Sequence, residues 1–167
     1  MPVPDVFPEE EDKTMRLGVS WSGVVIFALP MFINIAYALF PPANAPEETP
    51  KEKPLSEWVE QGSRMLYMLA ICFLVSRQPV RYGGFWFCAG ILFLLLYHIV
   101  WLRYFAGGRY TALLGKPFGP VPMPLVVFPV LYFLCAAIWL HNLPAVVCMI
   151  VFGAAHAVVS YRSLSRE

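Results

Sequence analysis

Charged residues are scarce in this chain of 167 residues, where Lys, Arg, Asp and Glu make up 14% against about 25% in a typical soluble domain. The net charge is only +1 and no basic stripe is present, so the sequence does not predict a nucleic-acid partner. Hydrophobic residues, by contrast, make up 59% of the chain, more than a domain of this size can bury. The composition therefore predicts an integral membrane protein.

Cysteine pairs of the CxxC type are also absent, which removes a common signature of zinc-binding and redox motifs. The four cysteines, Cys72, Cys88, Cys135 and Cys148, all lie in apolar runs, so we expect buried thiols that pack as small hydrophobic side chains. A redox pair between two helices is the alternative. The sequence predicts no cofactor.

Five apolar segments separated by polar loops predict an all-α, polytopic transmembrane helical bundle with short loops over residues 18–162. The second segment is the weakest, because only 65–76 is strongly apolar and about 20 residues are needed to cross a bilayer. Residues 1–17 are rich in proline and acidic residues and are expected to form an extended tail, disordered or lying on the surface. The expected spans are 18–40, 57–77, 85–104, 121–140 and 144–161.

Basic residues are unevenly divided between the two sides of this expected bundle. The side of the N-terminal tail, here called the N-side, carries four: Lys13, Arg16, Arg77 and Arg81. Because positively charged loops are retained in the cytoplasm, we expect the N-terminus outside and the C-terminus in the cytoplasm. The opposite side, here called the C-side, carries seven basic residues: Lys51, Lys53, Arg103, Arg109, Lys116, Arg162 and Arg166.

Polar side chains inside the spans are few, and such residues are functional candidates because hydrocarbon penalises them. At a rise of 1.5 Å per residue, all of them fall in the half of the membrane nearer the C-side. We therefore expect them to converge on a ligand-binding polar cavity that opens to the C-side. The five residues are Asn34, Glu60, Arg64, His98 and His156.

Each candidate also has a plainer interpretation. Glu60 and Arg64 stand four residues apart and can pair along one helix face, or they can simply lie in the headgroup layer. His98 and His156 can form hydrogen bonds between helices, and the small residues around His156 favour close packing by a neighbouring helix. HxxxH and ExxH spacings are absent, so no metal site is expected.

Two prolines inside the spans distort the helices at predictable places. Pro30 and Pro129 lack an N–H group, which leaves the carbonyl groups of Ile26 and Leu125 without their helical donors. Such carbonyls can line a cavity, or the prolines can merely shape the packing. At the end of the third span and in the loop after it, we expect Arg103, Arg109 and Lys116 to contact lipid headgroups on the C-side.

These observations favour a small multi-pass membrane protein that binds or translocates a small ligand, or serves as a subunit of a membrane assembly. Five spans form a small bundle, so we expect membrane lipids as surroundings and a homo-oligomer or a membrane partner subunit. The alternative is an intramembrane enzyme that acts on a lipid or isoprenoid, with Glu60 or His98 as the acid/base group and Arg64 or Arg103 as the charge stabiliser. A third possibility is a purely structural subunit. The sequence does not decide whether the protein is an enzyme, and it names no catalytic residue.

Overall fold

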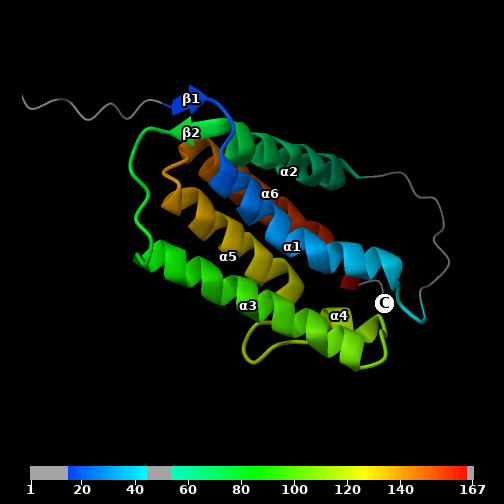
Figure 1. Ribbon diagram of the computed structural model, residues 1–167. Coiled ribbons are helices and arrows are strands. Elements are labelled where there is room, and N and C mark those ends of the chain that lie inside the picture. Colours follow the sequence, from blue (N-terminus) through cyan, green and yellow to red (C-terminus); the bar gives the residue numbers. More distant parts are fainter. Residues whose placement is uncertain (1–14, 45–53, 165–167) are drawn as a thin grey trace, which may run out of the picture.

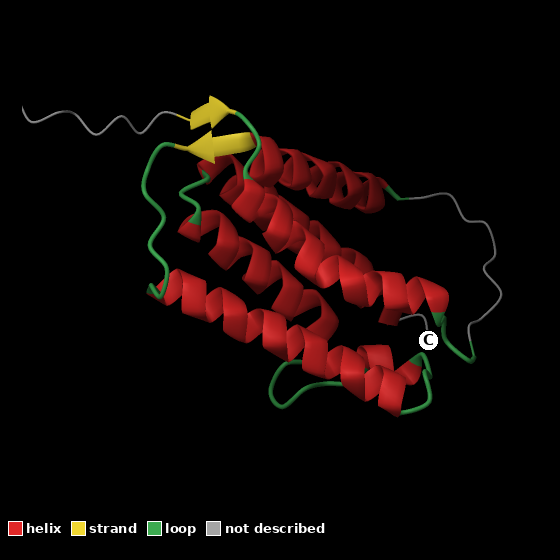
Figure 2. Cartoon of the chain, viewed as in Figure 1, coloured by secondary structure: helices red, strands yellow, loops and turns green. Residues whose placement is uncertain are grey.

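The computed structural model describes residues 15–44 and 54–164, which form six helices and one two-stranded sheet (Figures 1 and 2). The expectation of an all-α protein is confirmed. The helices are α1 (Trp21–Leu39), α2 (Leu55–Phe73), α3 (Phe85–Ala106), α4 (Ala112–Gly115), α5 (Pro124–Trp139) and α6 (Leu143–Leu164), and the strands are β1 (Met15–Leu17) and β2 (Leu74–Ser76).

The small sheet changes two boundaries that the sequence had placed differently. The helix expected over 57–77 ends at Phe73, because residues 74–76 leave it to pair with β1 in an antiparallel register that joins Met15 to Ser76 and Leu17 to Leu74. The last three residues of the tail expected over 1–17 are thus a strand, while residues 1–14 lie outside the described part of the chain. The pairing holds the chain that enters α1 against the end of α2.

Four long helices form a continuous layer, and α1 lies against it (Figure 1). α6 packs against α2 on one side and α5 on the other, while α5 packs in turn against α3. α1 makes smaller contacts with α2, α3 and α5. The buried core is therefore richest around α5 and α6, where Ala137, Ala145 and Met149 are almost inaccessible to solvent.

The outer surfaces of the helices carry large hydrophobic side chains at helical spacing. On α1 the exposed residues Val25, Leu29, Phe32 and Leu39 recur every three to seven positions and form one stripe. A soluble protein rarely exposes such a stripe, whereas hydrocarbon solvates it. Three of the described helices, α1, α3 and α6, are long and apolar enough to cross a membrane. The chain is an α-helical membrane protein.

Hydrogen bonds tie the helix ends together at both ends of the bundle. At the end with the sheet, Asn142 is buried and donates to the carbonyls of Ala70 and Leu74, so the start of α6 is fixed to the end of α2. At the other end, the Asn44 side chain accepts from the Thr111 N–H at 2.9 Å and joins the end of α1 to the start of α4. α1 is therefore anchored at both of its ends.

Candidate functional site

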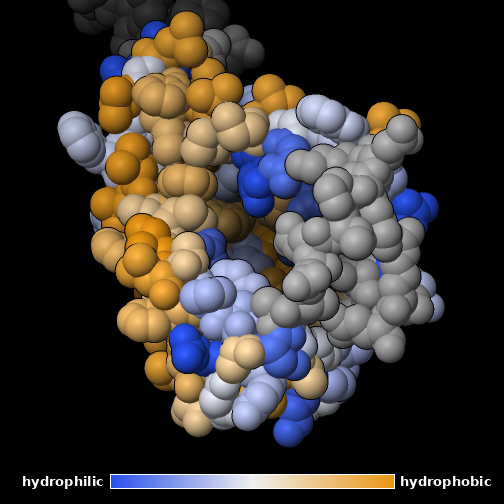
Figure 3. Space-filling view, turned by 90° about the vertical axis from the view of Figure 1, so that its right-hand side faces the viewer, coloured by the Kyte–Doolittle hydropathy of each residue, from blue (hydrophilic) through white to orange (hydrophobic). Residues whose placement is uncertain are grey.

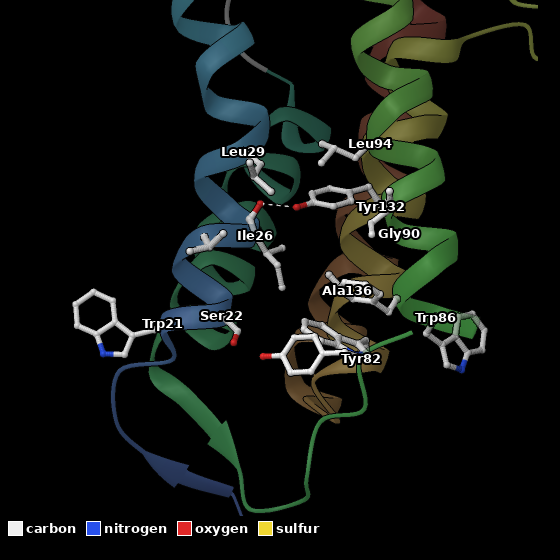
Figure 4. A pocket seen from close by; sticks show the side chains of 14 residues that line it. Trp21, Ser22, Ile26, Leu29, Tyr82, Trp86, Gly90, Leu94, Tyr132 and Ala136 are labelled. Atoms are coloured by element: carbon white, nitrogen blue, oxygen red, sulfur yellow. Dashed lines mark hydrogen bonds between the residues drawn. The ribbon is translucent and has the colours of Figure 1, made fainter. Parts of the chain in front are cut away.

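A pocket of about 470 Å³ lies between α1 and α3, with α5 as its floor (Figure 4). This volume falls within the range of about 300–1,000 Å³ that is usual for small-molecule sites. None of its lining residues is charged. The lining consists of Trp21, Ser22, Val25, Ile26 and Leu29 from α1, Tyr82, then Trp86, Phe87, Gly90, Ile91 and Leu94 from α3, and Tyr132, Ala136 and Trp139 from α5.

The side chain of Tyr132 extends from α5 to α1 and links the two helices. The Tyr132 hydroxyl donates a hydrogen bond of 2.8 Å to the carbonyl of Ile26 (Figure 4). That carbonyl is the one from which Pro30 withholds a donor, so Tyr132 satisfies a buried group that the proline leaves free. The expected distortion of α1 thus coincides with the pocket, and the freed carbonyl faces a neighbouring helix.

Aromatic side chains line the N-side end of the pocket. Tyr82 lies edge-on to both Phe87 and Trp139, with ring centroids 5.8 Å and 5.5 Å away. The indole N–H of Trp139 donates to the carbonyl of Arg81 at 2.8 Å, which fixes the loop before α3 to the end of α5. The wall formed by these rings is therefore held by bonds to the backbone as well as by ring packing.

Glycine at position 90 leaves room in the α3 wall. A Cβ atom added there would lie 3.7 Å from the Cβ of Cys135, which is an ordinary contact. The pocket thus owes part of its width to a missing side chain rather than to a tight helix crossing. Because Gly90 lines the pocket and its Cβ would have ordinary space, we expect a larger residue there to reduce the pocket volume.

Among the polar residues singled out from the sequence, Glu60 and His156 meet. Glu60 is buried, with 8% of its surface exposed, and its Oε1 lies 3.0 Å from Nδ1 of His156. The pair joins α2 to α6, and the ring of Phe152 stacks on the imidazole with centroids 5.1 Å apart. The alternative in which His156 forms a packed interhelical hydrogen bond matches this arrangement.

Asn34 and His98 lie elsewhere. Asn34 accepts a hydrogen bond of 2.9 Å from the Tyr97 hydroxyl, which joins α1 to α3. His98 follows Tyr97 but bonds the carbonyl of Leu94 on its own helix at 2.8 Å. Glu60 and His156 thus contact each other, Asn34 contacts Tyr97, and His98 bonds within its own helix. None of the five candidates lines the pocket between α1 and α3.

The arginines have partners other than the expected ones. Arg64 donates to the side chain of Gln61, while Glu60 faces His156, so the anticipated ion pair between Glu60 and Arg64 is replaced by two other contacts. Arg103, expected at lipid headgroups, donates to the carbonyls of Leu113, Lys116 and Pro117 and clamps the loop after α4.

The remaining headgroup candidates also lie at the C-side end of the bundle. Lys116 is exposed, and Arg109 is half-buried with its backbone in the left-handed region at φ 60°. The Arg109 carbonyl accepts from the N–H of Ala43, another tie between the loops after α1 and α3. Viewed from this end, the molecule shows hydrophilic residues around a hollow, with hydrophobic side chains along the adjacent side (Figure 3).

Two further sequence expectations concern how small residues pack. The small residues around His156 were expected to favour close packing by a neighbouring helix, and α5 packs closely there, because a Cβ on Gly153 would lie 2.8 Å from Cγ1 of Val130. Cys72 and Cys135 are buried as expected, but Cys88 is exposed on α3.

The pocket itself was missed in the sequence. Its lining is hydrophobic and aromatic apart from Ser22, whereas the sequence search considered only strongly polar and ionisable side chains inside the spans. One signal was available, namely the carbonyl of Ile26 released by Pro30, but its partner Tyr132 is 106 positions away in the chain. The donor that bonds a freed carbonyl cannot be identified from the local sequence pattern.

Fold and site together define a polytopic α-helical membrane protein with a lateral, uncharged pocket. Comparison with known proteins finds no matching family model, no matching curated protein and no matching solved structure.

Proposed function

We propose that this protein spans the membrane five times and binds a small, largely apolar ligand that enters from the bilayer into the pocket between α1 and α3. The pocket of about 470 Å³ is the observation that carries this proposal. Its hydrophobic lining suits a ligand that is already dissolved in hydrocarbon, and its position between two lipid-facing helices gives such a ligand a direct route.

The anchoring of α1 supports a pocket that exists before the ligand arrives. β1 and the bond from Ser20 N–H to the Cys72 carbonyl hold the start of α1, and Asn44 holds its end. Between these anchors, the bond from Tyr132 to Ile26 fixes the spacing to α5. A preformed site binds with less ordering cost than one that must assemble around its ligand.

The count of five spans follows from where the helix ends lie. α1 and α3 both begin at the end of the bundle with the sheet, so if both cross the membrane, α2 must carry the chain back between them (Figure 1). The same reasoning applies to α5 between α3 and α6. α2 has 19 residues, about 28 Å of helix, which is close to the ~30 Å of the hydrocarbon layer.

The orientation that we propose places the N-terminus outside and the C-side in the cytoplasm. Arg103, Arg109, Lys116 and Arg162 all lie in described segments of the C-side end, against Arg16, Arg77 and Arg81 at the other end. This distribution agrees with the positive-inside rule. In that orientation the aromatic end of the pocket lies in the outer leaflet.

Filling the pocket tests the proposal. We expect Gly90→Leu to abolish binding of a brominated long-chain alcohol, measured as tryptophan quenching in detergent-solubilised protein, because Trp21, Trp86 and Trp139 line the pocket. Gly62→Leu is the matched control, since nothing lies within 4 Å of a Cβ at Gly62. Equal quenching of both variants and of the wild type would refute pocket binding.

The second candidate function is acid/base chemistry on a lipid or isoprenoid, and the pair of Glu60 with His156 favours it. A buried carboxylate 3.0 Å from an imidazole is an arrangement that can move a proton between helices. Glu60→Gln keeps an oxygen that accepts from His156 but cannot take up a proton. We expect it to stop lipid turnover at unchanged thermal stability if the pair is catalytic, whereas an unchanged lipid profile leaves the pair a structural contact.

A further inference from the structure

We propose that the occupant of the pocket is a neutral, single-chain amphiphile whose hydroxyl-bearing head lies at the N-side end and whose tail points to the middle of the bilayer. This inference rests on the proposed ligand-binding function and narrows its ligand to one chemical class. Three features of the pocket carry it: its length, the position of its hydroxyl groups and its lack of charge.

The pocket is slightly shorter than half of the hydrocarbon layer, so it fits within one leaflet. On α1 it extends from Ser22 to Leu29, and on α3 from Trp86 to Leu94, which corresponds to about 10–12 Å of helix. Half of the hydrocarbon layer is about 15 Å. A chain that begins at the interface and follows this trough therefore ends near the bilayer centre, within one leaflet.

The hydroxyl groups of Ser22 and Tyr82 lie at one end of this trough. Figure 4 shows both oxygens at the end of the pocket next to the sheet, with Leu29 and Leu94 at the opposite end. Within the described part of the chain, neither hydroxyl forms a hydrogen bond. Two unused hydroxyls at the mouth of an apolar trough are suited to donate to and accept from a hydroxyl of the ligand.

The exposed indoles of Trp21 and Trp86 fix the level of this mouth. Both lie at the same end of the pocket as Ser22 and Tyr82, and both point away from it (Figure 4). Tryptophan collects at the boundary between headgroups and hydrocarbon. A head bound at Ser22 and Tyr82 thus remains at the depth where lipid hydroxyls and ester groups lie.

The lining argues for a head without charge. No lining residue is ionised at neutral pH, and an ion that enters such a site without a partner loses its hydration. Arg81 precedes Tyr82 in the chain, but its side chain is not part of the lining, and its carbonyl is occupied by Trp139. Two other ligands are the alternatives to be tested: an anionic amphiphile whose head reaches Arg81, and a plain hydrocarbon.

Two brominated isomers test the direction of binding. The probes are 2-bromo-1-dodecanol and 12-bromo-1-dodecanol, and the pocket signal is the tryptophan quenching of Gly62→Leu protein minus that of Gly90→Leu protein. Trp21 and Trp86 lie toward the mouth (Figure 4), and Trp139 contacts the ring of Tyr82 there, so we expect the head-brominated isomer to quench more strongly. Stronger quenching by the tail-brominated isomer would overturn the orientation. Leu29→Phe, which adds no tryptophan, serves as a second pocket-filling variant if Gly90→Leu does not fold.

Competition tests the nature of the head. We expect 1-dodecanol to displace the probe at about fivefold lower concentration than dodecane, and Ser22→Ala with Tyr82→Phe to remove that difference. Tyr110→Phe, an exposed tyrosine outside the pocket, is the control and keeps it. If dodecanoate or dodecane competes as well as 1-dodecanol, the proposal of a neutral hydroxyl head is refuted. Binding of an amphiphile or hydrocarbon in the pocket would then still be supported. If no probe distinguishes Gly62→Leu from Gly90→Leu and Leu29→Phe, the proposed function itself fails.

Discussion

Gly23 lies where α1 meets α2, and its replacement by alanine is the sharpest test of how α1 is held. A Cβ at this position would overlap the carbonyl oxygen of Ile71 and lie 2.8 Å from its carbonyl carbon. Both atoms belong to the backbone of α2, so no side-chain rotation relieves the contact. α1 must move away from α2, and with it the wall of the pocket that contains Ser22, Val25 and Ile26.

The size of the effect follows from two opposing contributions. Overpacking of this kind costs about 1–3 kcal/mol, and alanine in place of glycine in a helix returns up to about 1 kcal/mol. Gly90→Ala provides the matched control, because its Cβ has ordinary space and only the favourable contribution remains. We therefore expect Gly23→Ala to be less stable than Gly90→Ala by about 2 kcal/mol.

Unfolding in a detergent titration, followed by tryptophan fluorescence, measures this difference on both variants under identical conditions. The same preparations can be tested with the brominated alcohol, where we expect Gly23→Ala to lose quenching and Gly90→Ala to retain most of it. Equal stability of the two variants would show that α1 and α2 do not touch at Gly23. Lost stability with intact binding would show that the position of α1 does not define the pocket.

Two other substitutions test the remaining contacts. Asn142→Ala removes two hydrogen bonds to the carbonyls of Ala70 and Leu74, and the helix cap that Oδ1 provides to the Ala145 N–H. We therefore expect the free energy of unfolding to fall by about 3 kcal/mol. A loss below about 1 kcal/mol would show that Asn142 does not anchor the start of α6. Arg103→Gln removes a guanidinium that bonds three carbonyls, so we expect faster amide exchange in residues 109–120 with little change in thermal stability, and unchanged exchange there would contradict the clamp.

The polar residues show how far the sequence leads toward the site. The positions of Glu60 and His156 along their helices, both toward the C-side end, can be inferred from the sequence. The partner of Glu60 cannot be inferred from the sequence. Arg64 on the same helix and His156, 96 positions away, could each donate a hydrogen bond to its carboxylate. Only the rotation of α2 about its axis decides between them, and that rotation is set by packing against α6.

The sequence alone determined that the chain is helical and lies in a membrane, and it placed the long helices close to their true limits. These properties depend on the length of apolar runs and on prolines and glycines that interrupt them, which are local and additive. The pocket, the pairing of β1 with β2 and the partners of Asn34, Arg103 and Tyr132 were decided by the tertiary structure. Each depends on which faces of distant helices meet, and hydrocarbon surroundings reward almost any apolar face equally, so the sequence pattern leaves that choice open.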